Sequence, residues 1–194
     1  MIGIVMAGGK ASRMNLSQEK PLLVYKKPIV LHVLEALHDS GCFSRILAAT
    51  SPNSPHTRNI VMGSGYDTVE TPGNGFVEDL YFVLKSLDCP ALVVPADLPL
   101  LDGQIIRRIV QKCNTDTPWT SILARKCLSD SMGLSPGPYV ECDGTKCRYT
   151  GISMVNPLLI NGMDAIPEIH AIINDRRIAF NMNTRQDYDL LDTA

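Results

Sequence analysis

The sequence lacks several features that would by themselves assign a protein to a broad class. None of its six cysteines, at positions 42, 89, 113, 127, 142 and 147, stands in a CxxC pair, which argues against a zinc ribbon or a thioredoxin-like motif. We therefore expect free thiols in a reducing cytosol, with a Cys142–Cys147 pair in a hairpin as the minor alternative. No window supplies the roughly 18 apolar residues of a membrane span, and the first residues do not resemble a signal peptide. These absences predict a cytoplasmic protein with no membrane span.

Positive charge is not in excess either. The 18 Lys and Arg residues are balanced by 20 Asp and Glu residues, so that the formal net charge is −2. Broad nucleic-acid-binding faces depend on many phosphate contacts from basic side chains, so we expect no nucleic-acid partner. Any anion that the protein binds has to meet a local cluster of positive charge. With 194 residues, 45% of them hydrophobic, the chain is long enough to bury a core, and we expect one domain over residues 1–194.

What the sequence does contain is an alternation of apolar runs and amphipathic stretches. Runs typical of strands cover residues 2–7, 45–50, 66–70, 91–95 and 119–124, and helical periodicity covers residues 28–40, 55–62 and 76–87, with a further helix after Asp102. Strands separated by helices of this length imply parallel pairing with right-handed crossovers. The pattern predicts a three-layer, Rossmann-like α/β fold, with a mostly parallel central sheet and helices on both faces.

This rhythm breaks after the fifth predicted strand. Residues 125–150 contain the stretches SPGPY and CDGTK, which are typical of loops and turns. Beyond them we expect a strand at 151–155, a helix at 165–174, a strand at 178–181 and a final helix at 184–191.

A loop with glycines and positive charge follows the first predicted strand. It reads Gly8-Gly9-Lys10-Ala11-Ser12-Arg13, and Lys20 comes a few residues later. Glycines allow backbone N–H groups to approach phosphate oxygens, and the three basic side chains supply charge for a polyanion. The loop is neither a Walker A motif nor the GxGxxG of dinucleotide-binding proteins, and two glycines after a strand also suit a tight turn. Taken alone, the glycines leave both interpretations open.

A carboxylate follows the central predicted strand. Asp97, in the stretch Pro95–Leu101, is suited to Mg²⁺, which prefers oxygen ligands and keeps substrate phosphates in its shell. We favour this over a capping role because Asp102 is available to cap the next helix. Near the end of the chain, Asn183 suits either a helix cap or a metal ligand, and capping is the simpler interpretation.

Two further polar stretches follow the second and third predicted strands. Thr50 and Asn53 are suited to a ribose or a base edge. Gly75 precedes Glu78 and Asp79 at the start of a predicted helix, and a carboxylate can accept hydrogen bonds from both N1–H and N2–H₂ of guanine. This weakly favours guanine over adenine, although stabilisation of the helix dipole explains the two acids equally well.

Together these motifs resemble a known superfamily. AGGKASRM at 7–14, KPL at 20–22 and Asp97 after a central strand resemble the nucleotidyltransferases that include sugar-nucleotide pyrophosphorylases and molybdenum-cofactor guanylyltransferases. Further stretches are similar to the archaeal GTP:adenosylcobinamide-phosphate guanylyltransferase family, namely ATSPNSPHT at 49–57, GNGFVEDL at 73–80, VVPADLPLL at 93–101, TGISMVNP at 150–157 and FNMNTRQD at 180–187. The resemblance spans essentially the whole chain.

The resemblance implies transfer of GMP from GTP to the phosphate of a cobinamide corrinoid, with release of pyrophosphate. It implies a nucleotidyltransferase fold in which Arg13, Lys20 and Asp97 are catalytic and Asp97 and Asn183 hold Mg²⁺. The implied nucleotide site comprises Ala7, Gly8, Gly9, Lys10, Arg13, Lys20, Thr50, Asn53, Gly75, Glu78, Asp79 and Asp97, and acceptor contacts are expected at Gly151, Ile152 and Ser153. The partners are then GTP and a phosphorylated corrinoid, and a homodimer is compatible with them.

Other readings of the same motifs stay open. The stretch PADLPLL is closer to the molybdenum-cofactor enzymes, so molybdopterin or a sugar phosphate is an alternative acceptor. A non-catalytic GTP-binding regulator that kept the fold is an alternative of another class.

Overall fold

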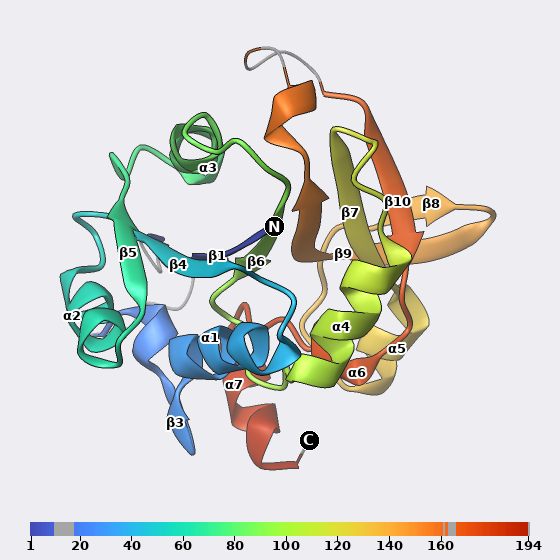
Figure 1. Ribbon diagram of the computed structural model, residues 1–194. Helices are drawn as coiled ribbons and strands as arrows, with labels where there is room; N and C mark the ends of the chain where they lie inside the picture. Colours follow the sequence, from blue (N-terminus) through green and yellow to red (C-terminus); the bar gives the residue numbers. More distant parts are fainter. Residues whose placement is uncertain (10–17, 161, 163–165, 194) are drawn as a thin grey trace.

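The computed structural model describes residues 1–9, 18–160, 162 and 166–193 (Figure 1). Its strands are β1 Ile2–Met6, β2 Val24–Tyr25, β3 Lys27–Pro28, β4 Arg45–Thr50, β5 Asp67–Glu70, β6 Ala91–Pro95, β7 Trp119–Arg125, β8 Val140–Cys142, β9 Thr145–Val155 and β10 Glu168–Ile172. Its α-helices are α1 Ile29–Ser40, α2 Pro55–Gly63, α3 Phe76–Leu84, α4 Gly103–Lys112, α5 Lys126–Ser131, α6 Arg176–Ala179 and α7 Arg185–Asp189. Three short 3₁₀ turns are η1 Lys20–Leu22, η2 Pro157–Leu159 and η3 Leu190–Thr193.

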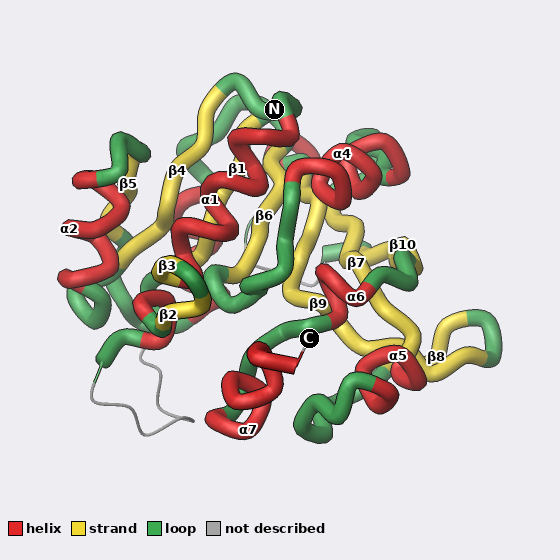
Figure 2. Tube along the Cα trace, turned by 90° about the horizontal axis from the view of Figure 1, so that it is seen from below, coloured by secondary structure: helices red, strands yellow, loops and turns green. Residues whose placement is uncertain are grey.

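The central sheet runs in the order β10-β7-β9-β6-β1-β4-β5, as Figure 2 shows from one edge to the other, and β8 extends it by pairing with β9. β1 pairs in parallel with β4 and β6, β4 with β5, and β7 with β10. β9 is the exception, because it runs antiparallel to both β6 and β7. The expected mostly parallel sheet is confirmed, and the wholly apolar β6 lies at its centre, where both of its faces are covered.

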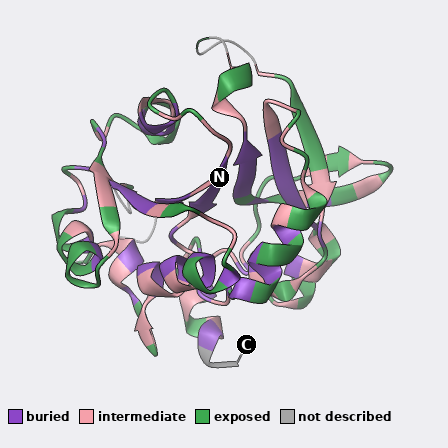
Figure 3. Ribbon diagram, viewed as in Figure 1, coloured by how far each residue is buried: buried purple, intermediate pink, exposed green. Residues whose placement is uncertain are grey.

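Helices cover both faces of the sheet, which confirms the predicted three layers (Figure 1). On one face, Val33, Leu34 and Leu37 of α1 and Ile105 and Ile109 of α4 are fully buried in the larger core cluster (Figure 3). On the other face, α3 packs through Leu80, Val83 and Leu84 against β1, β4 and β6. Helices α1 and α4 lie very close together on this face: a Cβ on Gly103 of α4 would lie only 2.7 Å from the backbone carbonyl carbon of Asp39 in α1.

The parallel strands bring distant loops to one edge. The loops that follow β1, β4 and β6 all leave the sheet at its carboxyl edge, where open α/β sheets bind their ligands. These loops contain Gly8 and Gly9, residues 51–54, and Asp97. The loop after β5, which is parallel to β4, leaves at the same edge, so the topology gathers all four candidate stretches that follow strands.

Three predictions for the last third of the chain are wrong. The stretch expected as a helix at 165–174 contains the strand β10, which pairs in parallel with β7 at the sheet edge. Of the stretch expected as a strand at 178–181, the first two residues lie in α6 and the other two lie in no strand; α6 begins because the Asp175 side chain accepts a hydrogen bond from the Arg177 N–H at 3.0 Å. The expected loop at 125–150 contains α5, β8 and the first half of β9. Short apolar runs are compatible with both helical and strand periodicity, so the strands available for pairing determine which structure forms.

The β8–β9 hairpin settles the arrangement of Cys142 and Cys147. Asp143 and Gly144 connect the strands with φ of 49° and 71°, as in two-residue hairpin turns. In this register Cys142 lies opposite Thr145, and Cys147 lies opposite Val140. The two thiols are therefore not paired, and all six cysteines of the chain are free.

The final helix, expected at 184–191, is confirmed as α7 continued by η3. Thr184 is its N-cap, and it forms a capping box with Asp187. The cap is therefore not Asn183, contrary to the expectation. Across the described residues, no helix has both the length and the apolarity that crossing a membrane requires.

Arg177 joins the start of α6 to the start of α4. Its Nε and Nη2 atoms donate to the two oxygens of Asp175 at 2.9 and 2.7 Å, and its Nη1 donates to Asp102 at 2.8 Å. The hydrogen bond from Arg177, against the opposing effect of burial, holds the pKa of Asp175 below its ordinary value. This paired carboxylate stabilises the segment that leads to Asn183.

We predict that Asp175→Asn lowers the free energy of unfolding by about 1 kcal/mol at neutral pH, because a bidentate, charge-assisted pair is lost. A lowered folded-state pKa contributes stability above the ordinary Asp pKa of about 3.9, and this stability is lost as the pH falls through the folded value. Urea unfolding at pH 7 and below about pH 3 should therefore show the difference only at pH 7. Asp67→Asn, at the exposed pair with Arg45, is the control and should change little. An equal loss at both pH values would contradict the assignment.

Candidate active site

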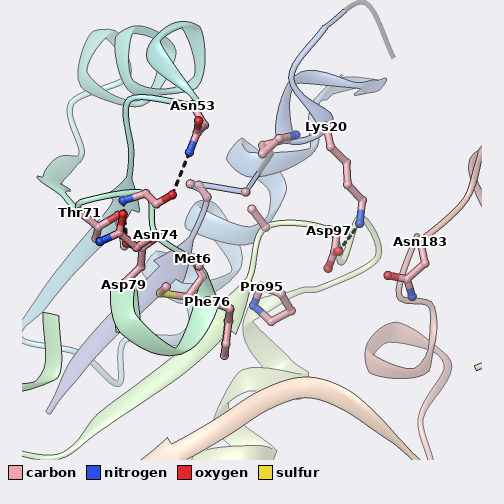
Figure 4. A pocket seen from close by; sticks show the side chains of 18 residues that line it. Met6, Lys20, Asn53, Thr71, Asn74, Phe76, Asp79, Pro95, Asp97 and Asn183 are labelled. Atoms are coloured by element: carbon pink, nitrogen blue, oxygen red, sulfur yellow. Dashed lines mark hydrogen bonds and ion pairs between the residues drawn. The ribbon is translucent and has the colours of Figure 1, made fainter. Parts of the chain in front are cut away.

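A cleft of about 500 Å³ lies at the carboxyl edge of the sheet (Figure 4). Of the predicted site residues within the described part of the chain, it is lined by Ala7, Gly8, Gly9, Lys20, Asn53, Gly75, Asp79, Asp97 and Asn183. Thr50 and Glu78 are not among its lining residues. Lys10 and Arg13 lie outside the described residues. The topology thus brings most of the predicted nucleotide site into one cavity.

Lys20 and Asp97 form an ion pair inside this cleft. The Lys20 ammonium, at the start of η1, donates to Asp97 Oδ2, and each side chain is only 17% exposed. Asp97 Oδ1 is buried and has no hydrogen-bond partner among the described residues. The Met182 N–H donates to the Asp97 carbonyl at 3.1 Å and so fixes the backbone beside it. Because buried polar atoms normally have partners, the orphaned oxygen indicates a place for a donor or a cation.

Two asparagines lie on the chain that passes Asp97. Asn183 lines the cleft, and Figure 4 shows its side-chain oxygen on the side of Asp97. Asn181 donates from Nδ2 to the Thr150 carbonyl at 3.2 Å, while its buried Oδ1 has no partner among the described residues. Asn181 was not among the predicted site residues. Its position two residues before Asn183 is the only signal for it in the sequence. Because this stretch is not a strand, the alternation of side chains along a strand does not apply to it.

The two glycines after β1 have different reasons to be glycine. A Cβ on Gly8 would lie 3.1 Å from Ser51 Cβ, and the Gly8 carbonyl accepts a hydrogen bond from Ser51 Oγ at 2.6 Å. Packing against the loop after β4 therefore requires a very small residue there. A Cβ on Gly9 would have no neighbour within 4 Å among the described residues, and Gly9 lines the cleft. The packing of the described residues does not explain Gly9, and its place in the cleft favours a ligand at this point.

The loop before α3 is held on both sides of Gly73. The Gly73 N–H donates to Asp79 Oδ1 at 2.8 Å, and Asn53 Nδ2 donates to the Gly73 carbonyl at 3.3 Å (Figure 4). Gly73 itself has φ of 75°, which a side chain would strain. Asp79 Oδ2 has no hydrogen-bond partner within the described part of the chain. Asp79 and Asn53 therefore shape this wall of the cleft.

The other two residues predicted to enclose the base are placed differently. Thr50 is fully buried, and its carbonyl accepts hydrogen bonds from the N–H and hydroxyl of Thr71 at 2.7 and 3.0 Å. Its side chain thus lies beneath the cleft wall. Glu78 is exposed, with Oε2 3.0 Å from the position that a Cβ on Gly75 would occupy.

Glu19 is a second residue that sequence reasoning missed. Its carboxylate accepts hydrogen bonds from the N–H groups of His56 and Thr57 at 2.9 and 2.6 Å and from Thr57 Oγ1 at 2.5 Å. Glu19 therefore caps α2, whose own N-cap residue, Ser54, makes no side-chain cap bond. The only sign of this role in the sequence is that an acid directly precedes Lys20, so that anchoring Glu19 also fixes the position of Lys20.

The residues expected at the acceptor lie in β9, beside the cleft rather than among its lining residues. Gly151 is exposed and has φ of 81°, and a Cβ there would lie 2.9 Å from Pro95 Cγ. Ile152 is fully buried in the core on the α1 side, so that only its main chain could meet a ligand. Ser153 lies on the α3 side, where its hydroxyl is 3.5 Å from that of Ser121.

Comparison with solved structures identifies the fold. The chain resembles a hypothetical transferase from Thermus thermophilus, with a TM-score of 0.63 and 22% identity over 81% of this chain and 66% of that one. It also resembles a CMP:2-keto-3-deoxy-manno-octonic acid synthetase complexed with CTP, with a TM-score of 0.68 and 14% identity over 100% and 96% of the two chains. The bifunctional IspDF of Campylobacter jejuni gives a TM-score of 0.70 and 14% identity over 98% and 54%. At these identities the likeness shows the nucleotidyltransferase fold alone.

Sequence comparison is more specific. The chain is 31% identical, over 98% of its own length and 95% of the relative's, to an adenosylcobinamide-phosphate guanylyltransferase of Methanocaldococcus jannaschii. The family model of the MobA-like NTP transferase domain matches residues 3–186. The protein therefore belongs to the MobA-like NTP transferases, a family of nucleotidyltransferases.

Proposed function

We propose that this protein, acting as one nucleotidyltransferase domain, transfers GMP from GTP to the phosphate of adenosylcobinamide phosphate and releases pyrophosphate. The nearly full-length likeness to a relative of that name supports the choice of acceptor and nucleotide. The observation that carries the chemistry is the Lys20–Asp97 pair, because it lies in the same cleft as Gly8 and Gly9.

The reaction is a substitution at phosphorus. An oxygen of the acceptor phosphate forms a bond to the α-phosphorus of GTP, while the bond from that phosphorus to the bridging β-phosphate oxygen breaks and pyrophosphate leaves with the electron pair. Two anions have to approach each other, so positioning and charge neutralisation are the main catalytic demands. The phosphate acceptor is already ionised at neutral pH, so no general base is required. Lys20 supplies one positive charge beside the reacting phosphates, and we propose that Arg13 supplies another.

The residues present fit Mg²⁺. Asp97 Oδ1 is buried without a partner among the described residues, and the Asn183 side-chain oxygen lies on the same side of the cleft. Among the described residues no three His, Cys, Asp or Glu side chains are placed to hold a metal ion together, which suits a cation that takes most of its ligands from phosphates and water. Asp97 and Asn183 would hold Mg²⁺, which supplies charge stabilisation to the α-phosphate and the departing pyrophosphate.

We propose that Asp79 reads guanine. Its Oδ1 is occupied by the Gly73 N–H, but its Oδ2 has no partner among the described residues and the side chain lines the cleft. A carboxylate oxygen there accepts hydrogen bonds from N1–H or N2–H₂ of guanine, and adenine offers neither group in that position. Asn53 and Gly75 would complete the wall around the nucleoside.

We expect Asp97→Asn to lower kcat/KM by about 100-fold or more, because the replacement is isosteric but removes the charge that positions Lys20 and the cation. The measurement is pyrophosphate release with GTP, Mg²⁺ and adenosylcobinamide phosphate. Asp189→Asn, at an exposed pair with Arg185 in α7, is the matched control. A near-normal rate in Asp97→Asn, with Tm unchanged, would contradict the proposed chemistry.

We expect GTP to raise Tm more than ATP, CTP or UTP does. Asp79→Asn keeps an acceptor for the Gly73 N–H but replaces the second carboxylate oxygen by a donor, so its preference for GTP over ATP should fall about tenfold. The ratio of the two dissociation constants measures this directly. An unchanged ratio would leave Asp79 as a residue that only holds the loop, and equal Tm shifts for all four nucleotides in the unaltered protein would refute the guanine assignment.

We propose Glu19 as a positioning residue, because its carboxylate binds α2 and so anchors the segment that contains Lys20. Glu19→Ala should raise the KM for GTP about tenfold with little change in Tm, since the anchor is lost but the core is untouched. The decisive measurement is the same substitution in a Lys20→Ala background, where it should cost almost nothing further. Additive losses in that double-mutant cycle would show that Glu19 acts through the general stability of α2.

A further inference from the structure

A second hollow, an apolar groove of about 480 Å³, lies beside the cleft. Val77, Tyr81 and Leu84 of α3 line one side of it, and Leu158 and Ile160 line the other. Trp119, the single tryptophan of the chain, lies at its base at the start of β7. The volume falls in the usual range for a small-molecule site.

The groove exposes apolar side chains that the fold does not use. α3 packs on the sheet through Leu80, Val83 and Leu84, whereas Val77 is 63% exposed and Phe76 55%. Leu158, across the groove, is also 63% exposed. Among the described lining residues only Lys85 is charged, and its ammonium lies over the Phe82 ring, 4.8 Å from the centroid. A contiguous apolar surface of this kind indicates an uncharged, apolar ligand.

The groove adjoins the cleft at one residue. Phe76 lines both hollows. It stands at the first turn of α3, next to the Gly73–Gly75 loop, while Leu87 and Trp119 line the groove toward the opposite edge of the sheet. A molecule that lies in the groove therefore presents one end to the cleft at Phe76.

A row of polar side chains, none of them among the described residues that line the groove, begins at Ser121, which contacts Trp119. Trp119 Nε1 donates to Ser121 Oγ at 3.0 Å, and Ser121 donates to Glu168. Tyr149 OH donates to the other Glu168 oxygen at 3.4 Å and lies 3.3 Å from His170 Nε2. Burial, followed by the charge of Glu168, raises the pKa of Tyr149 and so keeps its hydroxyl protonated. This row, on the face that α3 covers only over β1, β4 and β6, offers donors and acceptors around the Glu168 carboxylate, which Ser121 and Tyr149 share.

We infer that the apolar groove seats the body of the acceptor, an apolar macrocycle with peripheral amides, while its phosphate arm passes Phe76 into the cleft. The inference rests on the proposed function. The ring system of a corrinoid matches the apolar walls, and its amide side chains match the Ser121–Glu168–Tyr149–His170 row. The arm delivers the only anionic end of the acceptor to Lys20, where positive charge is available.

Val77→Asp and Leu158→Asp test this inference. Each places a carboxylate in the apolar wall and should raise the KM for adenosylcobinamide phosphate about tenfold or more, with the KM for GTP unchanged. Met62→Asp, at a 54% exposed apolar position on α2 outside the groove, is the matched control. Val77→Ser and Leu158→Ser give a milder series if an aspartate variant folds poorly.

A binding measurement is independent of catalysis. Adenosylcobinamide without the phosphate should quench the fluorescence of Trp119, and both aspartate variants should weaken this quenching about tenfold. An unaltered protein that binds GTP but transfers no GMP to adenosylcobinamide phosphate would refute the proposed function. Quenching that is absent, or unchanged in the variants, would overturn the groove assignment, as would an unchanged acceptor KM with transfer intact. A Val77→Asp variant that changes only the molar mass in light scattering would identify the groove as an interface between two copies and overturn it too.

Discussion

The site depends on the Asp97 carboxylate, which has a hydrogen-bond partner at only one of its two oxygens among the described residues. One of its oxygens receives the Lys20 ammonium from a segment 77 residues away, and the other is buried without a partner among the described residues. An isolated buried charge is costly, so the carboxylate is held in place by its lysine and by the chain at Met182. The carboxylate is thereby fixed at the carboxyl edge of the sheet, inside the cleft. Lys20 in turn depends on Glu19, because the anchor on α2 determines where this segment lies.

Much of this arrangement could be predicted from the sequence, because parallel β-α-β connections place every loop after a strand at the same edge. That rule alone brings Gly8, Asn53 and Asp97 together, although they are far apart in the chain. It does not determine how each residue is used. Thr50 is beneath the wall because β4 turns that side chain toward the core, and Thr184 rather than Asn183 caps α7 because its hydroxyl reaches the Asp187 N–H.

The errors concentrate where long-range pairing decides local structure. Residues 168–172 fit both a helical and a strand period, and only the free edge of β7 makes them a strand. The β8–β9 hairpin is not predicted for a related reason. Its turn residues, Asp143-Gly144, suggest the end of regular structure, whereas they connect two paired strands. For Glu19 the sequence offers only the weak signal of an acid directly before Lys20, because its three hydrogen bonds go to backbone and hydroxyl groups of α2, which have no sequence pattern of their own.

The reversal of β9 divides the sheet into two regions that are covered differently. On the β5–β4–β1–β6 side every strand is parallel and α3 covers the face, so that the loops after these strands line the cleft. Beyond β6 the chain returns antiparallel as β9, and α3 does not extend over β7 and β10. A side chain of the sheet itself, that of Glu168, is then exposed on that face. The helix edge at Phe76 separates the two regions and contacts both hollows, so a nucleotide and a bulky acceptor can be held by different physical means and still meet at Asp97.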